Sequence, residues 1–317
     1  MRPARRIRLV LAAAAAAAAC ALLAAGCGLG PGKSPTGVSL TVTRDFGTRT
    51  LKQARRPHVS GTETVMRLLM RNARVGTAYG GGFVQSIDGL SGGGSGGHVD
   101  WFYYVNGVQG TKGAAATDVH PGDSVWWDRH DWKASETIPA VVGSFPQPFL
   151  GGVGGRRLPV RIECASGAVQ KACGVVSQRL AAYGIPAAEG SLRTSVTEHT
   201  LRVLVGPWAA VSEDPAIARM QDGPDASGVY AEPAPAGHTI ALLDPLGHTV
   251  RTLGAGGGLI AATQVEGDPP IWTVSGTDTA GVNAAANAFS ARVLKDRFAV
   301  AVAPGGALVP LPEDPAR

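Results

Sequence analysis

The chain has 317 residues, of which 44% are hydrophobic, and it carries a formal net charge of +5. Four of its 29 basic residues lie in the first eight positions, so a mature chain without them has 25 basic against 24 acidic residues. Such a neutral protein lacks the basic face that attracts phosphate backbones, which excludes a nucleic-acid-binding protein. About 290 mature residues are enough for two domains of ordinary size.

The N-terminus is typical of a bacterial export signal. Basic residues precede an apolar run from Leu9 to Ala25, which at about 17 residues is shorter than the roughly 20 of a spanning helix. The run ends with Gly26 before Cys27, an arrangement that resembles lipoprotein processing, although Ala24 stands where such motifs usually carry Leu, Val or Ile. We predict a lipoprotein signal peptide over residues 1–27, with Cys27 lipidated on the outer face of the cytoplasmic membrane. An ordinary signal peptide or an uncleaved anchor is the alternative.

The next segments predict a small domain over residues 38–144. Residues 28–37 are rich in Gly, Pro, Ser and Thr and are interpreted as a flexible spacer. Apolar alternation from Val38 to Phe46 predicts a strand, and the spacing of Ser60 and Glu63 predicts a capping box at the start of a helix.

Further strands are expected toward the end of this domain. They cover Phe83–Ile87, the segment HVDWFYYVNG that ends in an Asn106-Gly107 turn, and a segment that starts at Ser124. The Pro- and Gly-rich residues 145–155 are predicted to be a linker.

The second half alternates strand and helix signals. Strands are expected at 158–162, 201–205, 228–231, 239–243, 271–274 and 298–302, and helices at 168–183, 214–220 and 279–294. This alternation predicts an α/β domain of unknown function over residues 156–304, with a largely parallel sheet covered by helices, and a tail over 305–317. The glycines of 254–263 are interpreted as a plain loop before a helix-compatible segment, because they match neither the P-loop nor the dinucleotide fingerprint.

Two cysteines remain after Cys27. Cys164 and Cys173 are nine positions apart, and an exported chain lies where disulfides persist. We predict a bridge that pins a strand to the following helix; two buried apolar thiols are the alternative.

Aromatic residues are concentrated between positions 101 and 132. This segment holds seven of the chain's 18 Phe, Trp and Tyr residues. Alternation along a strand places Trp101 and Tyr103 on one face and Phe102 and Tyr104 on the other. One set must be core, whereas the other could be either core or an exposed platform for a ligand or partner.

Three motifs in this domain resemble a known family. FVQSIDGL (83–90), WFYYVNG (101–107) and PGDSVWW (121–127) are similar to the transcobalamin-like C-terminal domain family, over roughly Val38 to Trp132. The resemblance implies an α+β, β-grasp-like N-terminal domain. In vertebrate cobalamin carriers this domain closes over a corrinoid held mainly by an α-helical barrel, which this chain lacks.

The sequence therefore favours a binding or accessory protein and no enzyme. The candidate ligand-binding residues are Phe83, Ser86, Trp101, Tyr103, Tyr104, Asn106, Trp126, Trp127 and Trp132. The expected partners are the membrane, through the lipid anchor, and a small ligand such as a corrinoid that is passed to a membrane importer. No resident cofactor is predicted. The alternative is a structural or partner-docking lipoprotein of the envelope that binds protein or wall polymer.

The segment WDRHDW (127–132) is a candidate metal site. Asp128, His130 and Asp131 lie close together, and His130 is also the candidate lower ligand of a corrinoid cobalt. No third ligand at zinc-like spacing accompanies them, so a polar loop is the preferred interpretation and no metal is predicted.

Overall fold

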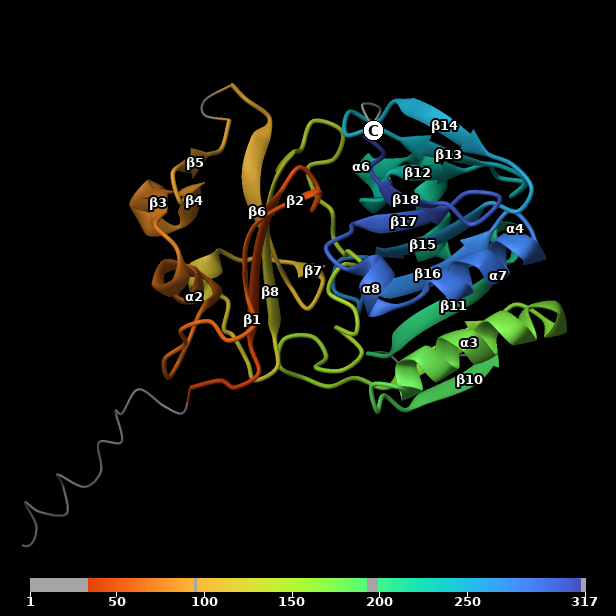
Figure 1. The fold of residues 1–317 in the computed structure, drawn as a ribbon, viewed down its shortest axis with the longest axis horizontal. Helices are drawn as coiled ribbons and strands as arrows, with labels where there is room; N and C mark the ends of the chain where they lie inside the picture. Colours follow the sequence, from red (N-terminus) through yellow and green to blue (C-terminus); the bar gives the residue numbers. More distant parts are fainter. Residues whose placement is uncertain (1–33, 94–95, 193–198, 315–317) are drawn as a thin grey trace, which may run out of the picture.

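The computed structural model describes residues 34–93, 96–192 and 199–314, which form a smaller N-terminal module packed against a larger second module (Figure 1). The predicted signal peptide and Cys27 lie outside the described residues. None of the helices within those ranges is long and apolar enough to cross a membrane.

The N-terminal module is a mixed sheet with a helix on one face. Its elements are β1 (Ser39–Arg44), β2 (Arg49–Ala54), α2 (Val65–Asn72), β3 (Val75–Ala78), β4 (Phe83–Ile87), β5 (Leu90–Ser91), β6 (Val99–Val105), β7 (Val108–Gln109) and β8 (Ser124–Asp131). The main sheet has the order β2-β1-β8-β6-β7, in which β1 and β8 are parallel, and β3, β4 and β5 form a second, small sheet.

Alternating apolar residues explain why α2 lies on this sheet. Leu40 and Val42 of β1 face the buried side of α2, which contributes Val65, Leu68 and Leu69 to the same core. The helix begins one turn later than the Ser60 capping box predicts. Thr64 is the N-cap and accepts a hydrogen bond from the Arg67 amide.

The second module is built on a larger sheet. Its elements are β9 (Val160–Cys164), α3 (Gln170–Ala181), β10 (Ala187–Ser191), β11 (Leu201–Pro207), α4 (Trp208–Val211), α5 (Pro215–Ala218), α6 (Pro224–Ser227), β12 (Ala231–Pro233), β13 (Ile240–Leu243), β14 (Thr249–Leu253), β15 (Gly258–Thr263), β16 (Ile271–Gly276), α7 (Thr279–Ala288), α8 (Ala291–Leu294), β17 (Ala299–Val302) and β18 (Leu308–Leu311). The main sheet has the order β10-β9-β11-β16-β15-β17-β18, and β12, β13 and β14 form a separate small sheet.

The predicted fold class is wrong. The described chain is mostly β, with four sheets and few long helices, and the sheet of the second module is mixed. Its β10, β9, β11 and β16 are parallel, but β15 and β17 join it through antiparallel pairings, as does the terminal strand β18.

The cause of this error is the segment 258–263. Its glycines and small residues predict a loop and a helix-compatible stretch, yet it forms β15 between β16 and β17 and is buried on both faces. Glycine suits this position because a Cβ at Gly258 would lie 2.6 Å from the Gly281 carbonyl oxygen of α7. Close packing of a helix on the sheet, rather than a loop conformation, accounts for the small residues.

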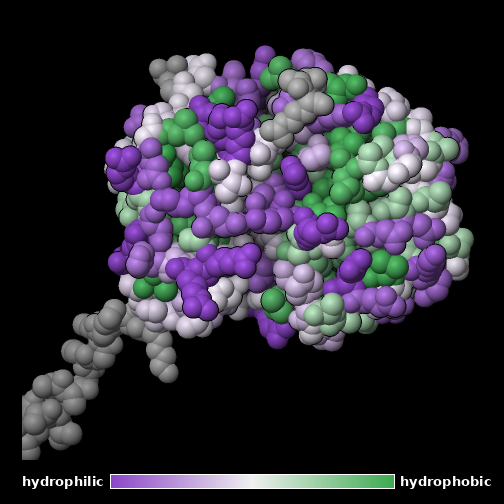
Figure 2. All heavy atoms as spheres, in the orientation of Figure 1, coloured by the Kyte–Doolittle hydropathy of each residue, from purple (hydrophilic) through white to green (hydrophobic). Residues whose placement is uncertain are grey.

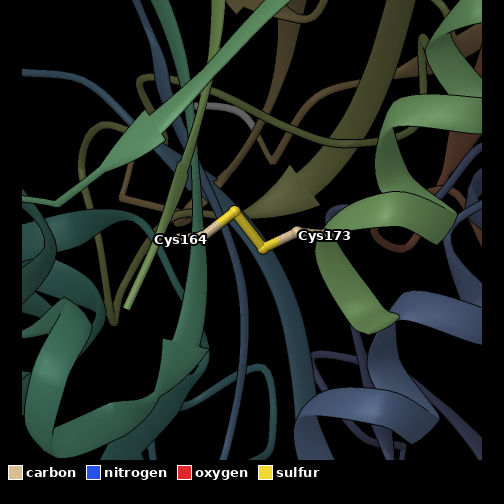
Figure 3. The surroundings of a disulfide bond; sticks show 2 residues. All are labelled: Cys164 and Cys173. Atoms are coloured by element: carbon tan, nitrogen blue, oxygen red, sulfur yellow. A yellow bond between two sulfur atoms is a disulfide. The ribbon is translucent and has the colours of Figure 1, made fainter. Parts of the chain in front are cut away.

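The predicted disulfide is present. Cys164 at the end of β9 is bonded to Cys173 on α3, with their Cα atoms 6.3 Å apart (Figure 3). The bond joins a strand to the helix that follows it, in the arrangement that the spacing predicted.

Candidate functional site

The aromatic residues of β6 and β8 divide between two faces of the N-terminal sheet. Trp101, Tyr103 and Trp127 lie under α2 in the core of that module. Tyr104 and Trp126 point to the opposite face, where the second module covers them. Neither face is therefore an exposed platform in this structure.

Phe298, just before β17, fills the covered face. Its ring lies 5.6 Å from Tyr104, 5.2 Å from Trp126, 5.3 Å from His130 and 5.3 Å from Phe46, measured between centroids. Edge-to-face contacts of this kind stabilise beyond the area that they bury. Because the faces of a strand alternate, Tyr104 and Trp126 lie on one face of the sheet. There they surround Phe298, a residue about 170 positions after Trp126 in the same chain.

A buried carboxylate organises the same face. Asp128 accepts hydrogen bonds from the amides of Phe46 at 3.1 Å and Gly47 at 2.8 Å, and from the hydroxyl of Thr43. His130 Nδ1 lies 2.9 Å from Asp128 Oδ1, the oxygen that also accepts from the Phe46 amide. These bonds give partners to the amides of the turn between β1 and β2. They also give the buried carboxylate of Asp128 the hydrogen bonds that a buried polar group requires. No group of three or more His, Cys, Asp or Glu in the described ranges could hold a metal ion.

Two tyrosines at this interface have buried hydroxyl groups without hydrogen-bond partners. Burial raises the pKa of Tyr104 well above its ordinary value, and Asp128 and Tyr230 add to the rise. Burial likewise raises the pKa of Tyr230. Both phenols therefore remain neutral near pH 7 and act as packing groups.

The remaining candidates are scattered. Asn106 is buried in the predicted turn and donates to Asp123 Oδ1 at 2.8 Å, so its role is structural. Trp132 is half-buried and donates to Asp100 Oδ2 at 2.9 Å. Ser86 is half-buried on β4, whereas Phe83 on the same strand is 38% exposed. The structure does not bring these four residues together with the buried aromatic set.

A cleft that the sequence does not mark lies between the modules. It has a volume of about 560 Å³, whereas two other clefts along the same interface have about 290 Å³ each. Its lining comes from both modules: Gln109, Gly110, Thr111, Thr137 and Pro139 on one side, and Arg219, Asp225, Ala226, Gly228, Gln264 and Glu266 on the other.

Backbone contacts set the shape of this cleft. The Asn106-Gly107 turn, with φ of 55° and 79°, leads directly into β7. Residues 135–139, which we call the crossing segment, follow β8 on the way to the second module. Gln109 binds this segment twice: its amide donates to the Pro139 carbonyl at 3.1 Å, and its side-chain oxygen accepts from the Ile138 amide at 2.7 Å. The wall of the cleft on this side is therefore fixed by paired hydrogen bonds.

The opposite wall approaches this segment closely. A Cβ on Gly228 would lie 2.6 Å from Pro139 Cδ, and Gly228 has φ of 74°, so glycine is required there. The Ser135 hydroxyl donates to the Pro224 carbonyl at 2.9 Å, which ties the crossing segment to α6. These contacts join the two walls of the cleft.

The sequence gives little signal for this cleft. Its lining mixes small, polar and charged side chains from separate segments of both modules, without a motif or a cluster of one chemical type. Only the Asn106-Gly107 turn, which positions Gln109, could be predicted. The lining of the second wall depends on tertiary packing across more than 80 positions.

The comparisons identify a domain family but no function. Residues 62–131, from just before α2 to the end of β8, match a family described as a domain of unknown function (DUF4430). The chain has no match among curated proteins. The family match covers the segment on which the transcobalamin-like resemblance rests, and it does not assign a ligand.

Proposed function

We propose that the protein is a lipid-anchored extracytoplasmic binding protein whose small ligand occupies the cleft between the two modules. One observation supports this proposal above the others: a cleft of about 560 Å³ is lined by hydrogen-bonding side chains from both modules. Ligand sites are typically clefts of about 300–1,000 Å³ and occur preferentially at domain interfaces. The export signal and the predicted anchor at Cys27 support the location.

The lining favours a polar ligand of low net charge. Gln109, Gln264, Thr111 and Thr137 offer amide and hydroxyl groups, and the lining also includes one guanidinium, that of Arg219, and the two carboxylates of Asp225 and Glu266. A strongly anionic ligand would be opposed by the carboxylates. A zwitterion or a neutral amide or polyol matches this set.

A corrinoid passed to an importer is the narrower form of this proposal. Its amide side chains suit the glutamine and threonine groups of the cleft. A whole corrinoid with its side chains is bulkier than this cleft, so that only part of it would be enclosed. The Phe298 cage is filled and offers no second face for the ring.

Calorimetric titration of the mature chain tests the proposal. The panel contains a zwitterionic amino acid mixture, neutral sugars, cobinamide and cobalamin, and the key variant is Ala226→Trp, which places an indole ring in the cleft. We expect one class to bind and the variant to weaken its binding by at least about a hundredfold, since the indole takes up space that the ligand needs for its contacts. Undiminished binding by Ala226→Trp would place the ligand elsewhere.

A partner-docking lipoprotein is a second candidate, favoured by an exposed aromatic pair. Tyr79 is 91% exposed, and its ring lies 6.2 Å from that of Phe83 at the β3–β4 hairpin. Tyr79→Ala is therefore the control variant. It leaves ligand titration unchanged under the first proposal, and it lowers recovery of an envelope partner under the second.

A further inference from the structure

Charge is divided unequally along the folded chain. Residues 38–90 contain eight lysines and arginines against three acidic residues, whereas residues 91–317 contain 16 against 21. The near-neutral total therefore conceals a basic segment at the start of the N-terminal module and an acidic remainder. A separation of this kind orients a molecule in an external field.

The basic residues lie on two neighbouring elements. Arg49, Arg55 and Arg56 are exposed on or just after the edge strand β2, and Arg67 and Arg71 are exposed on α2. Lys52 links the elements, because its ammonium contacts the Asn72 carbonyl at the end of α2 and lies 2.9 Å from Asp88. Figure 2 shows hydrophilic side chains gathered over this module. We call the surface formed by Lys52 of β2, by Arg56, and by Arg67 and Arg71 of α2 the basic face. Arg55 is not part of it, because Arg55 lines a cleft between the two modules together with Gln53 and Asp296.

Part of this charge is not neutralised within the protein. Arg71 pairs with the buried Glu63 at 3.1 Å, and Arg49 lies 4.0 Å from Asp45. Among the described residues, no carboxylate pairs with Arg56, and Arg67 donates to the Thr62 carbonyl at 3.2 Å rather than to a carboxylate. The charges of these two guanidinium groups are available to an anionic partner.

Exposed apolar side chains lie among the charges. Leu51 on β2 is 46% exposed and Met70 on α2 is 47% exposed. Basic residues that surround apolar ones are typical of surfaces that rest in the interface of an anionic bilayer. Charges on an edge strand also prevent pairing with another chain, but that role does not require the arginines of α2.

We propose that the basic face rests on the anionic phospholipid surface that holds the lipid anchor. The inference relies on the proposed location outside the membrane. Ser39 lies twelve positions after Cys27, and a chain of this length reaches at most about 40 Å. Such a tether confines the module to the neighbourhood of the bilayer, and each basic residue adds to the attraction once it comes within a Debye length, about 8–10 Å, of the headgroups.

This orientation places one wall of the cleft relative to the bilayer. β2 is one edge of the five-stranded sheet and β7, which carries the Gln109 wall of the cleft, is the other. Four strand spacings separate them, about 19 Å. With the β2 edge toward the bilayer, the Gln109 wall of the cleft lies at the edge of the sheet that is farther from the headgroups.

Vesicle sedimentation tests the orientation. The chain from Gly28 onward is suitable, because all three hydrophobic cores are formed by residues from Val38 onward. We expect it to bind vesicles of phosphatidylglycerol and phosphatidylcholine and not vesicles of phosphatidylcholine alone. Arg56→Glu with Arg67→Glu should weaken binding at least about tenfold. The matched control is Lys171→Glu with Arg179→Glu, which changes net charge equally on exposed positions of α3 and should bind nearly as the parent does.

Three results would overturn the inference. They are no binding to anionic vesicles, equal losses in the two double variants, and binding to a soluble anionic wall polymer without binding to vesicles. Ligand titration keeps this test separate from the proposed function. The Arg56→Glu, Arg67→Glu variant should retain its calorimetric response, whereas Ala226→Trp should lose the response and still sediment with vesicles.

Discussion

At the scale of single residues, the structure shifts the pKa values of two aspartates in opposite directions. Burial raises the pKa of Asp296, and Asp128 adds to the rise, although Lys295 and Arg297 oppose it. A hydrogen bond from the Arg74 amide lowers the pKa of Asp88, and Lys52 lowers it further. Both residues have positive φ, 55° and 49°, a conformation that asparagine also tolerates. Substitution by asparagine therefore isolates the charge.

We predict opposite pH dependences for these two substitutions. Asp296 binds its proton more tightly in the folded state, so its contribution to stability is present below its unfolded pKa and lost as pH rises through the raised value. Asp296→Asn should therefore be more stable than the parent at pH 7 and equal to it near pH 3. Asp88 contributes above its unfolded pKa and loses that contribution in acid, so Asp88→Asn should be the less stable protein at pH 7.

Urea unfolding midpoints at both pH values measure these differences. Because Asp88 lies at the surface, its effect should be the smaller of the two. A stabilising effect of Asp296→Asn that persists unchanged at pH 3 would show that backbone or packing changes, and not ionisation, are responsible.

Residue-scale prediction from the sequence succeeds where local chemistry decides the conformation. The Asn106-Gly107 turn forms because both residues adopt positive φ, as that dipeptide predicts. The helix cap shows the limit of such prediction. Glu63 accepts from the Ser60 amide at 3.0 Å as in a capping box, but the helix starts after Thr64. Local patterns identify the partners more reliably than the boundary.

At the scale of elements, alternation identified the strands that have one polar face. Val38–Phe46 and the HVDWFYYVNG segment were predicted and correspond to β1 and β6. β15 was missed because it is buried on both faces, and so it lacks alternation and resembles a glycine loop. The predicted helix over 279–294 is interrupted at Phe289, whose side chain packs against Trp272 and Phe145. The order of strands in a mixed sheet depends on contacts that no local pattern contains.

The disulfide gives an element-scale prediction. Replacing Cys164 and Cys173 by alanine removes a constraint on a short loop of the unfolded chain. The chain-entropy model then predicts a loss of about 2.5 kcal/mol in the free energy of unfolding. Guanidinium denaturation of the double variant and the parent measures this loss.

Reduction provides the control for that experiment. A reducing agent should lower the unfolding midpoint of the parent toward that of the alanine variant and leave the variant unchanged. Equal midpoints for the oxidised parent and the variant would mean that α3 is held on the sheet by its buried apolar side chains alone, which include Val176 and Leu180.

At the scale of the whole molecule, the two modules share a hydrophobic core. Phe46, Tyr104 and Trp126 of the first module belong to the same buried cluster as Tyr230 and Phe298 of the second. The sequence predicts that one aromatic set belongs to the core. It does not predict that Phe298 covers the other set, because Phe298 lies in a distant segment and no local pattern links it to β6 or β8. The cleft is equally hard to predict, since its two walls come from segments that are far apart in the sequence.

Phe298→Ala should therefore destabilise the contact between modules as well as the second module itself. Removing a fully packed phenylalanine costs about 3–5 kcal/mol, and Phe298 is only 3% exposed within a cage of four rings. Phe289→Ala is the matched variant, because its ring contacts Phe145 and Trp272 and is remote from the cage. Both substitutions should lower the free energy of unfolding. Only Phe298→Ala should accelerate amide hydrogen exchange in β8, because that strand carries Trp126 and His130 beneath the missing ring. Equal protection of β8 in the two variants would mean that the aromatic face is sealed by the rest of the interface and that Phe298 is not its anchor.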